Sequence, residues 1–313
     1  MQEKILKIVY FLLKKAILNV EVINLNFLPR TDLAAEDLEN EGKSEVENYN
    51  VGNLNVQKIA LDEANAKKYG KKEGIYYTIT TDAIIDLEHD LATEVSITLA
   101  KILEDIYEEY NLTQESYILV LGLGNDEITP DSLGPKAVKN IFVTKHLADL
   151  GQLDEGLGII GAIAPGVMGQ TGIETSDIIR ALVKKTKPEL VLVIDALASR
   201  SLHRVNRTVQ ISTAGINPGS GVGNKRKEIS YKTLGVPVVA IGVPTVVDIA
   251  SIFYDIKDFF NETDDEIDIR SSLIESDLNF MVTNKDIDEM MNMMADIISK
   301  AVNISIHNLE IYE

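Results

Sequence analysis

The 313-residue sequence has no cysteine and comparatively few basic residues. Without cysteine, the chain can form no disulfide, thiolate zinc site, iron–sulfur cluster or cysteine nucleophile. Since no disulfide calls for an oxidising compartment, we expect an intracellular protein. The 30 basic residues stand against 49 acidic residues, for a formal net charge of −19. That balance argues against a dedicated nucleic-acid-binding protein, which needs a basic surface, and suits a soluble enzyme.

Long hydrophobic runs are also missing from the basic N-terminal segment, residues 1–16 (MQEKILKIVYFLLKKA). Its longest uncharged stretch, from Ile8 to Leu13, has six residues. A membrane-spanning helix needs about 20 apolar residues, and the core of a signal peptide about 7–15. We therefore expect no membrane association, but a removable or loosely packed N-terminal segment.

From residue 117 onward, apolar strand-like segments alternate with amphipathic helical segments. This alternation is typical of an α/β protein with a mostly parallel sheet covered by helices on both faces. Two short strand-like pieces near the N-terminus predict a small additional β element. The acidic segments 31–47 and 261–268 are expected to be exposed loops. Strands are expected at 55–61, 75–80, 117–123, 157–164, 190–194, 208–212 and 236–243, and helices at 89–110, 136–150, 175–185, 247–260 and 285–306.

Two acidic residues follow apolar strands of the predicted sheet. Asp131 lies in the loop after the strand at 117–123, and Asp195 comes directly after the strand at 190–194. Ligands of parallel α/β sheets bind beyond the carboxyl ends of the strands, so the two carboxyl groups are placed to share one crevice. Two close carboxyl groups share a proton and can act as acid and base on a water molecule. The plain alternative is that Asp131 caps a helix near Gly134 and Asp195 caps a turn before Ser199.

Further candidates surround this pair. Asn125, Lys136 and Arg200 are expected to support the two aspartates or the substrate. Lys225 and Arg226 belong to a basic cluster in an acidic protein, which is either an exposed loop or a site for a substrate carboxylate or a subunit contact.

Long motifs that cover most of the chain from about residue 29 resemble the spore germination protease family. These motifs are RTDLA (30–34), YGKKEGIYYT (69–78), GLGN…TPDSLGPKAV (122–138), AIAPGVMGQTGIETSDII (162–179), VIDALASRS (193–201), INPGSGVGNKRKEISYKTLGVPVVAIGVPTVVD (216–248) and NFMVT (279–283). The resemblance implies an endopeptidase of the spore core cytoplasm that degrades small acid-soluble spore proteins during germination. It also implies a fold like that of the hydrogenase-maturation endopeptidases.

The same resemblance implies a homotetramer made as a zymogen and activated by removal of an N-terminal propeptide. Its two proposed catalytic aspartates fall on Asp131 and Asp195, as in an atypical aspartic peptidase without metal or cofactor. Residues 1–34 then form the extension or propeptide, and 35–313 a single catalytic domain with an acidic loop at 261–278. The chain departs from the family in that loop, which is shorter, and in a longer and more apolar start. The self-cleavage site is expected within Thr31, Asp32, Leu33, Ala34 and Ala35.

Other functions remain open on the sequence. A metal-dependent maturation peptidase of the same fold would need a histidine ligand beside the aspartates, and His203 is the nearest candidate. A chain that binds spore proteins without cutting them is a second alternative. A nucleoside-phosphorylase-like binding protein is a more distant one, because folds of this class carry several chemistries.

Overall fold

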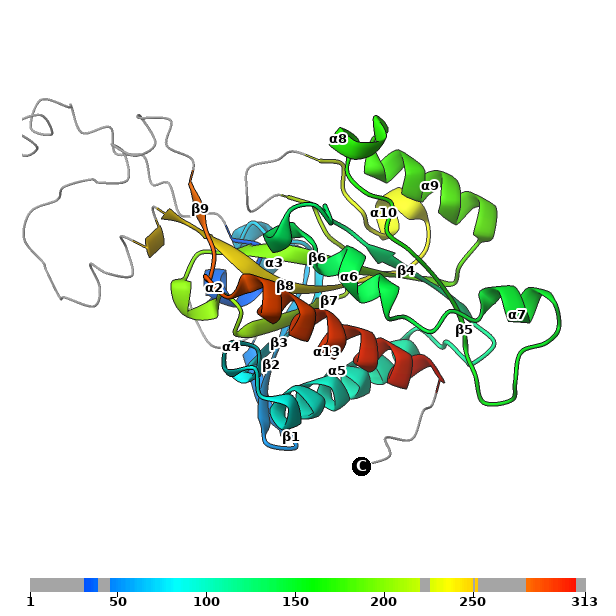
Figure 1. The fold of residues 1–313 in the computed structure, drawn as a ribbon, viewed down its shortest axis with the longest axis horizontal. Helices are drawn as coiled ribbons and strands as arrows, with labels where there is room; N and C mark the ends of the chain where they lie inside the picture. Colours follow the sequence, from blue (N-terminus) through cyan, green and yellow to red (C-terminus); the bar gives the residue numbers. More distant parts are fainter. Residues whose placement is uncertain (1–30, 39–45, 220–225, 250, 253–279, 308–313) are drawn as a thin grey trace, which may run out of the picture.

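The computed structural model describes residues 31–38, 46–219, 226–249, 251–252 and 280–307. Within these residues one twisted sheet runs through the molecule, with helices packed against it (Figure 1). Its strand order is β1-β2-β3-β7-β8-β6-β4-β5, and β9 pairs with β8. The strands are β1 (Val46–Val51), β2 (Leu54–Leu61), β3 (Gly74–Thr80), β4 (Tyr117–Gly122), β5 (Ile159–Ile163), β6 (Leu190–Ser199), β7 (Thr208–Ser212), β8 (Val238–Asp248) and β9 (Met281–Val282).

The core of the sheet is parallel, as the apolar strands predict. β5, β4, β6 and β8 are neighbours in this order and all run the same way. Every residue of β4 is buried, because helices cover both faces of this part of the sheet. The predicted α/β fold with a mostly parallel core is therefore confirmed.

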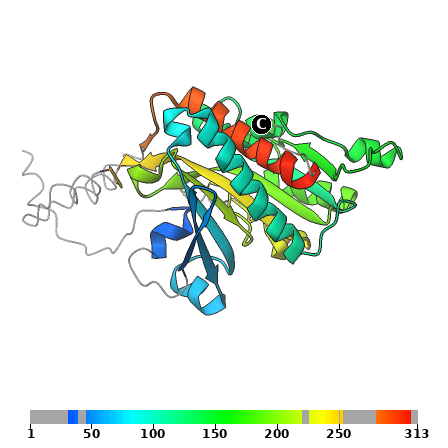
Figure 2. The same ribbon diagram turned by 90° about the horizontal axis from the view of Figure 1, so that it is seen from below.

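The predicted small N-terminal β element is also present, and it is continuous with this core. β1, β2 and β3 form an antiparallel meander, and β3 joins the core through β7. Figure 2 shows this blue-to-cyan extension leaving the parallel strands on one side of the molecule. The strands within residues 46–80 are thereby part of the same sheet that carries Asp195.

Side chains that alternate along the core strands fill two separate hydrophobic clusters. Ile118 and Val120 of β4 pack in one cluster, and Leu119 and Leu121 pack in the other. The first cluster lies under α5, α6 and α13, and Figure 1 shows α5 and α13 side by side in front of the sheet. The second lies under α9. These helices are α5 (His89–Glu109), α6 (Leu133–Lys139), α9 (Thr175–Thr186) and α13 (Ile287–His307).

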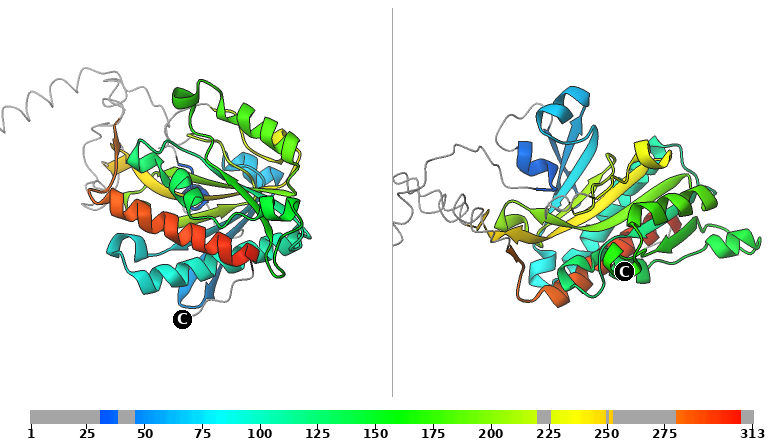
Figure 3. Two further views of the ribbon diagram at one scale, coloured as in Figure 1. Left: turned by 45° about the vertical axis from the view of Figure 1, so that its right-hand side comes forward. Right: turned by 90° about the horizontal axis from the view of Figure 1, so that it is seen from above.

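Shorter helices connect and flank these layers. Among them, α2 packs its alanines against β2 and β3, close to the blue strands in the right-hand view of Figure 3. They are α2 (Ala34–Leu38), α3 (Glu63–Lys68), α4 (Ala83–Asp86), α7 (Lys145–Asp149), α8 (Met168–Thr171) and α10 (Tyr231–Leu234), with the 3₁₀ turns η1 (Thr129–Asp131) and η2 (Leu202–Arg204).

One predicted helix is two helices in the structure. The chain ends α6 at Lys139 and begins α7 only at Lys145. Between them, the hydroxyl of buried Thr144 donates to the carbonyl of Gly158 at 2.6 Å and accepts from the amide of Ile160 at 3.0 Å. These bonds hold the connecting segment against β5, so the prediction of one helix over 136–150 is wrong.

Two further expectations on element boundaries are also wrong. The helix predicted from residue 247 starts later, because Val247 and Asp248 belong to β8 and pair with β9. Residues 253–260 of that predicted helix, and the acidic loop 261–278, lie outside the described residues. The acidic segment 31–47 is not a solvated loop throughout, since it contains α2 and the start of β1. Its residues Leu33 to Glu36 are buried, since apolar side chains and a paired acid outweigh the surrounding charge.

Candidate active site

Asp195 lies inside β6, on the face of the sheet opposite to α5 and α13. Residues Leu190 to Ile194 form the buried apolar part of the strand, and Asp195 continues it with only 4% of its surface exposed. The residue opposite Asp195 on β8 is Gly242. A Cβ atom on Gly242 would lie 2.5 Å from the side chain of Leu197, so glycine allows the two strands to pack closely here.

Asp131 reaches the same end of the sheet from the loop that follows β4. The amide of Asn125 donates to the Asp131 carboxylate Oδ2 at 2.9 Å and to the Asp131 backbone carbonyl at 3.0 Å. Gly124, with φ +114°, permits this contact, because a Cβ atom there would lie 1.9 Å from that carbonyl. The hydroxyl of Thr245 on β8 donates to the Pro130 carbonyl at 2.7 Å and fixes the turn from the other side.

Neither aspartate is a helix cap. The N-cap of α6 is Ser132, and the Asp131 carboxylate instead accepts from Asn125. Asp195 is in mid-strand, and its Oδ1 accepts from the amide of Ala196 at 3.0 Å. The plain alternative of two capping residues is therefore wrong.

The two carboxyl groups interact electrostatically and differ in their surroundings. Burial raises the pKa of Asp195 well above its ordinary value, and the nearby charges of Asp131 and Asp32 raise it further. Burial also raises the pKa of Asp131, while the Asn125 amide and the positive charge of Arg226 oppose this. Asp195 is therefore the residue of the pair whose charged form is disfavoured more strongly.

Residues 31–36, called here the N-terminal strap, bind the last part of β6. β4 pairs with β6 only as far as Ile194, and the strap binds β6 beyond that point. The amide of Asp32 donates to the Ala198 carbonyl at 3.1 Å, and the Ala198 amide donates to the Asp32 carboxylate at 2.9 Å. The segment expected to contain the self-cleavage site is therefore bound beside Asp195.

The strap is also held by Gln210 of β7 and by Lys71, in the loop before β3. The Gln210 side chain accepts from the amide of Ala34 at 2.8 Å and donates to the Asp32 carbonyl at 3.4 Å. The Lys71 amine donates to the Thr31 carbonyl at 3.0 Å. Leu33 is fully buried, so the strap is anchored by both apolar burial and hydrogen bonds.

A second buried acid, Glu36, ends the strap. Its carboxylate accepts from the Ser199 hydroxyl at 2.7 Å, the Arg200 amide at 2.8 Å and the Ser201 amide at 3.0 Å. The Arg204 guanidinium lies 3.8 Å from the same carboxylate. We call the four residues Ser199, Arg200, Ser201 and Arg204 the Glu36 clamp.

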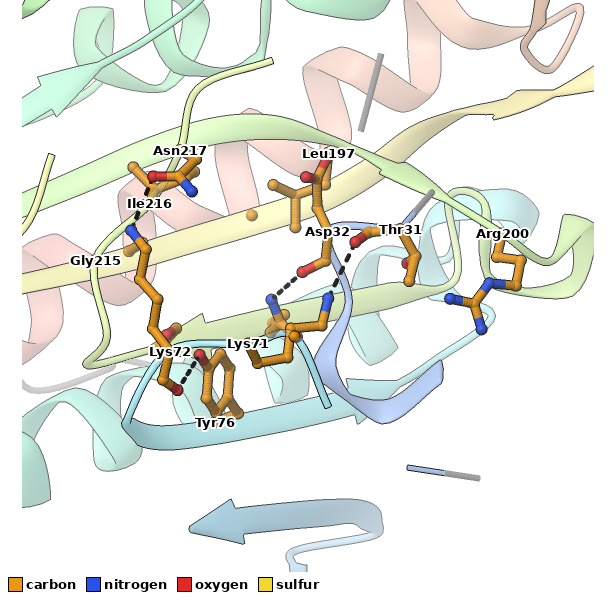
Figure 4. A pocket seen from close by; sticks show the side chains of 15 residues that line it. Thr31, Asp32, Lys71, Lys72, Tyr76, Leu197, Arg200, Gly215, Ile216 and Asn217 are labelled. Atoms are coloured by element: carbon orange, nitrogen blue, oxygen red, sulfur yellow. Dashed lines mark hydrogen bonds between the residues drawn. The ribbon is translucent and has the colours of Figure 1, made fainter. Parts of the chain in front are cut away.

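A cavity of about 340 Å³ opens beside the strap (Figure 4). Thr31 and Asp32 form one wall, and Gly242 of β8 lies in its lining. Figure 4 shows Lys71 and Lys72 entering from the loop before β3, with the Lys72 amine 2.9 Å from the Asn217 amide oxygen. Charged and polar side chains thus line the space next to the expected cleavage segment.

The structure brings most of the predicted residues to this site. Asn125 contacts Asp131, Arg200 belongs to the clamp and lines the cavity, and Arg226 acts electrostatically on both aspartates. Lys136 is placed elsewhere: its amine donates to the Asn292 side chain of α13 at 2.6 Å. Lys225 lies outside the described residues.

Sequence reasoning missed Glu36, Gln210 and Thr245. Glu36 lies in an acidic segment whose charge suggested a solvated loop, and Gln210 and Thr245 are polar residues inside apolar strands. For Gln210 and Thr245 the sequence offered one signal: a polar residue inside a buried strand needs a hydrogen-bond partner.

The metal-dependent alternative finds no ligand set in the part of the chain that the structure describes. There, no group of three or more His, Cys, Asp or Glu side chains is arranged to hold a metal ion. His203 is exposed on η2, where its amide donates to the Ser201 hydroxyl at 3.3 Å. In the same residues, we find no helix with the length and apolar character of a membrane span.

Comparison with known proteins gives matches over most of the chain. Residues 26–264 match the family model described as germination protease. The germination protease of Oceanobacillus iheyensis is 45% identical over 294 residues, which cover 87% of this chain and 80% of that protein. The germination protease of Bacillus cereus strain ATCC 10987 is 51% identical over 208 residues, which cover 66% of this chain and 57% of that protein.

Among solved structures, a [NiFe] hydrogenase maturation protease, HycI from Thermococcus kodakarensis, is a match. Its sequence identity to this chain is 16% and the TM-score is 0.33. The match covers 64% of this chain and 98% of that chain.

Proposed function

The chain belongs to the germination protease family, and from this membership we propose that it is an endopeptidase that begins the degradation of small acid-soluble spore proteins when a spore germinates. We further propose that it is made as a zymogen, works as a homotetramer in the spore core, and has 1–34 as its propeptide. The relatives are germination proteases, which supports the peptidase activity and its place in germination.

Asp131 and Asp195 form the catalytic pair in this proposal. The ionised Asp131 takes a proton from a water molecule while the water oxygen attacks the peptide carbonyl carbon. The protonated Asp195 gives its proton to the carbonyl oxygen. When the C–N bond breaks, the leaving nitrogen takes the proton from Asp131, and a hydroxyl of the intermediate returns a proton to Asp195. Both carboxyl groups end in their starting states.

The position of the strap is the observation that carries this proposal. A chain segment bound through Ala198 is held a few residues from Asp195, whose pKa responds to the charge of Asp32 in that segment. A self-cleaving enzyme needs its own scissile segment at this place. The same contacts explain a zymogen, because a substrate chain cannot pair with Ala198 while Asp32 does.

The test compares three substitutions in the full chain. We expect Asp131→Asn and Asp195→Asn each to lower the rates of self-cleavage and of spore-protein cleavage by roughly 10²–10⁴-fold, since each removes the acid or the base. Asp126→Asn is the matched control, because Asp126 is an exposed acid in the same loop whose carboxylate accepts from the Gln170 side chain at 3.1 Å. Mass spectrometry of the N-terminus gives the self-cleavage rate, and a gel assay gives the substrate rate.

Folding is followed in parallel by circular dichroism and size-exclusion chromatography. Wild-type rates in both catalytic variants would exclude the proposed pair. Loss of activity in the Asp126→Asn control as well would show that the loop is only sensitive to any change.

A further inference from the structure

Strand β8 has one extra residue, Thr245, where it pairs with β6. Leu197 of β6 lies opposite Pro244, but the next residue, Ala198, lies opposite Val246. Thr245 therefore has no partner on β6, which is the pattern of a β-bulge. Bulges are rare between parallel strands, and they are common beside active sites, where they turn a side chain in a new direction.

The Thr245 side chain reaches the turn η1, which contains Asp131. Its hydroxyl donates to the Pro130 carbonyl at 2.7 Å, and Thr245 is only 1% exposed. This carbonyl belongs to the peptide group that joins Pro130 to Asp131. Because proline has no amide hydrogen, the carbonyl is also the one backbone group through which Pro130 can be held by a hydrogen bond.

Asp131 is thereby held by two kinds of hydrogen bond. The amide of Asn125 donates to its carboxylate at 2.9 Å and to its backbone carbonyl at 3.0 Å, but Asn125 lies in the same loop and fixes only the shape of that loop. Thr245 lies on β8, the strand next to β6. Since β6 carries Asp195, the Thr245 hydrogen bond fixes the Asp131 turn relative to the strand of the second aspartate.

Thr245 is itself held by the chain after β9. The hydroxyl of Thr283 donates to the Thr245 carbonyl at 2.7 Å. Thr283 directly follows Val282, which pairs with Val247 of β8. Two successive hydrogen bonds from hydroxyl to carbonyl therefore connect β9 with the Asp131 turn.

We infer that Thr245 is a positioning residue for catalysis, whose hydroxyl holds the Asp131 carboxylate where it can act together with Asp195, and that Thr283 supports it. This inference rests on the proposed function. Thr245 acts through Pro130 and Asp131 and does not bind the substrate. Its contribution is nevertheless large, because a displacement of about 1 Å in a catalytic group can cost about 10²-fold in rate.

The test uses full-length chains that differ in one hydroxyl group. Thr245→Val keeps the shape of the side chain and removes the hydroxyl, whereas Thr245→Ser keeps the hydroxyl. We expect Thr245→Val to slow self-cleavage and to lower kcat on a small acid-soluble spore protein by about 10- to 100-fold, with KM within about twofold of the wild type. Thr245→Ser should recover most of the lost rate, and Thr283→Val should lower the rate less than Thr245→Val.

The pH–rate profile gives a readout that a general loss of stability would not change. The Asn125 amide and the charge of Arg226 lower the pKa of Asp131, burial raises it, and Asp195 is the neighbouring acid in the site. A displaced turn weakens the Asn125 hydrogen bond, so the pKa of Asp131 should rise in Thr245→Val. The acid limb of the profile should then move to higher pH, and Thr245→Ser should restore it.

Thr144→Val is the matched control, because the buried Thr144 hydroxyl also donates to a carbonyl, that of Gly158 at 2.6 Å, in the connection between α6 and α7. Urea unfolding should show that Thr144→Val and Thr245→Val are both destabilised, whereas the control keeps the wild-type kcat and pH profile. A wild-type kcat in Thr245→Val, or a kcat in Thr245→Ser as low as in Thr245→Val, would overturn the inference.

Thr283→Val decides the question if Thr245→Val does not fold, since it leaves the Thr245 side chain in place. An unchanged rate and an unmoved profile in Thr283→Val would then overturn the inference. These results would leave the proposed function intact. Wild-type rates in both Asp131→Asn and Asp195→Asn would instead exclude the proposed catalytic pair and the inference together.

Discussion

Asp195 of β6 and Glu36 at the end of the strap are equally buried acids, but their hydrogen-bond donors and neighbouring charges differ. Each is 4% exposed. Glu36 accepts hydrogen bonds from a hydroxyl and two amides and lies near Arg204. Asp195 accepts a hydrogen bond from the amide of the neighbouring Ala196. The charges of two further acids, Asp131 and Asp32, raise its pKa.

The difference separates an anchor from a reactive group. Donors around Glu36 bind its carboxylate oxygens, so this side chain can hold a segment of the chain in place. Around Asp195, burial and like charges raise the pKa and so disfavour the charged form. The two residues are equally buried, and they differ in the number of hydrogen-bond donors around their carboxyl groups.

Among these substitutions, we expect the largest effect from replacing Glu36, which holds the strap. Glu36→Gln replaces a charged acceptor of three hydrogen bonds by an amide and removes the negative charge 3.8 Å from Arg204, so we expect the free energy of strap release to fall by about 2–3 kcal/mol. Hydrogen exchange at the amides of Asp32 and Ala34 should then be about 30- to 100-fold faster.

Glu94→Gln is the matched control, because Glu94 also accepts a backbone hydrogen bond, from Asn53 at 2.6 Å, but far from the strap in sequence and on α5. It should leave exchange in the strap unchanged. If Glu36→Gln behaves like this control, the clamp does not hold the strap.

Replacing the reactive acid should have the opposite effect on stability. The pKa of Asp195 is raised in the folded protein, so its stabilising effect is complete below the unfolded pKa of about 4 and is lost as pH rises through the folded pKa. Asp195→Asn avoids that loss, and we expect the variant to be more stable than the wild type at pH 7.5.

Urea unfolding at pH 7.5 and near pH 4 measures this difference. The gain should shrink towards the acid value, where the wild-type carboxyl is protonated in both states. A variant that is less stable than the wild type at pH 7.5 would mean that the Asp195 charge is stabilised in the site.

The smallest effect is a displacement of the pH–rate profile. Arg226 lowers the pKa of both Asp131 and Asp195. Cleavage falls on the acid side as Asp131 gains a proton and on the alkaline side as Asp195 loses its proton. Arg226→Gln should therefore move both limbs of the pH–rate profile to higher pH.

Lys227→Gln is the control, because the Lys227 amine pairs with Asp177 at 3.0 Å. An unmoved profile in both variants would exclude the role of Arg226.

The fold was largely predictable because its signals are local. The apolar strands 117–123 and 190–194 and the amphipathic helices 89–110 and 285–306 each carry their own periodicity, and the structure confirms them. Errors arose where a distant contact decided the outcome. Thr144 stops a helix through bonds to the chain at β5, and β9 extends β8 into a segment that has helical spacing.

The site was predictable in part for the same reason. An aspartate after four or five apolar strand residues is visible in the sequence at Asp195. The position of Asp131 follows from the topology of a parallel sheet. Glu36 could not be found this way, because its partners are backbone amides and a hydroxyl more than 160 residues away. Every residue except proline has a backbone amide, so the sequence does not show which amides will bind a carboxylate.

The strap and the end of β6 that it binds belong to one molecule, and this has a consequence for inhibition. An attached segment competes at an effective concentration on the order of millimolar that dilution does not change. A soluble peptide that copies the strap would therefore have to exceed that concentration, or bind more tightly, to displace it from the uncleaved chain. Once cleavage cuts the chain and the segment dissociates, the same peptide should block the end of β6 at far lower concentrations.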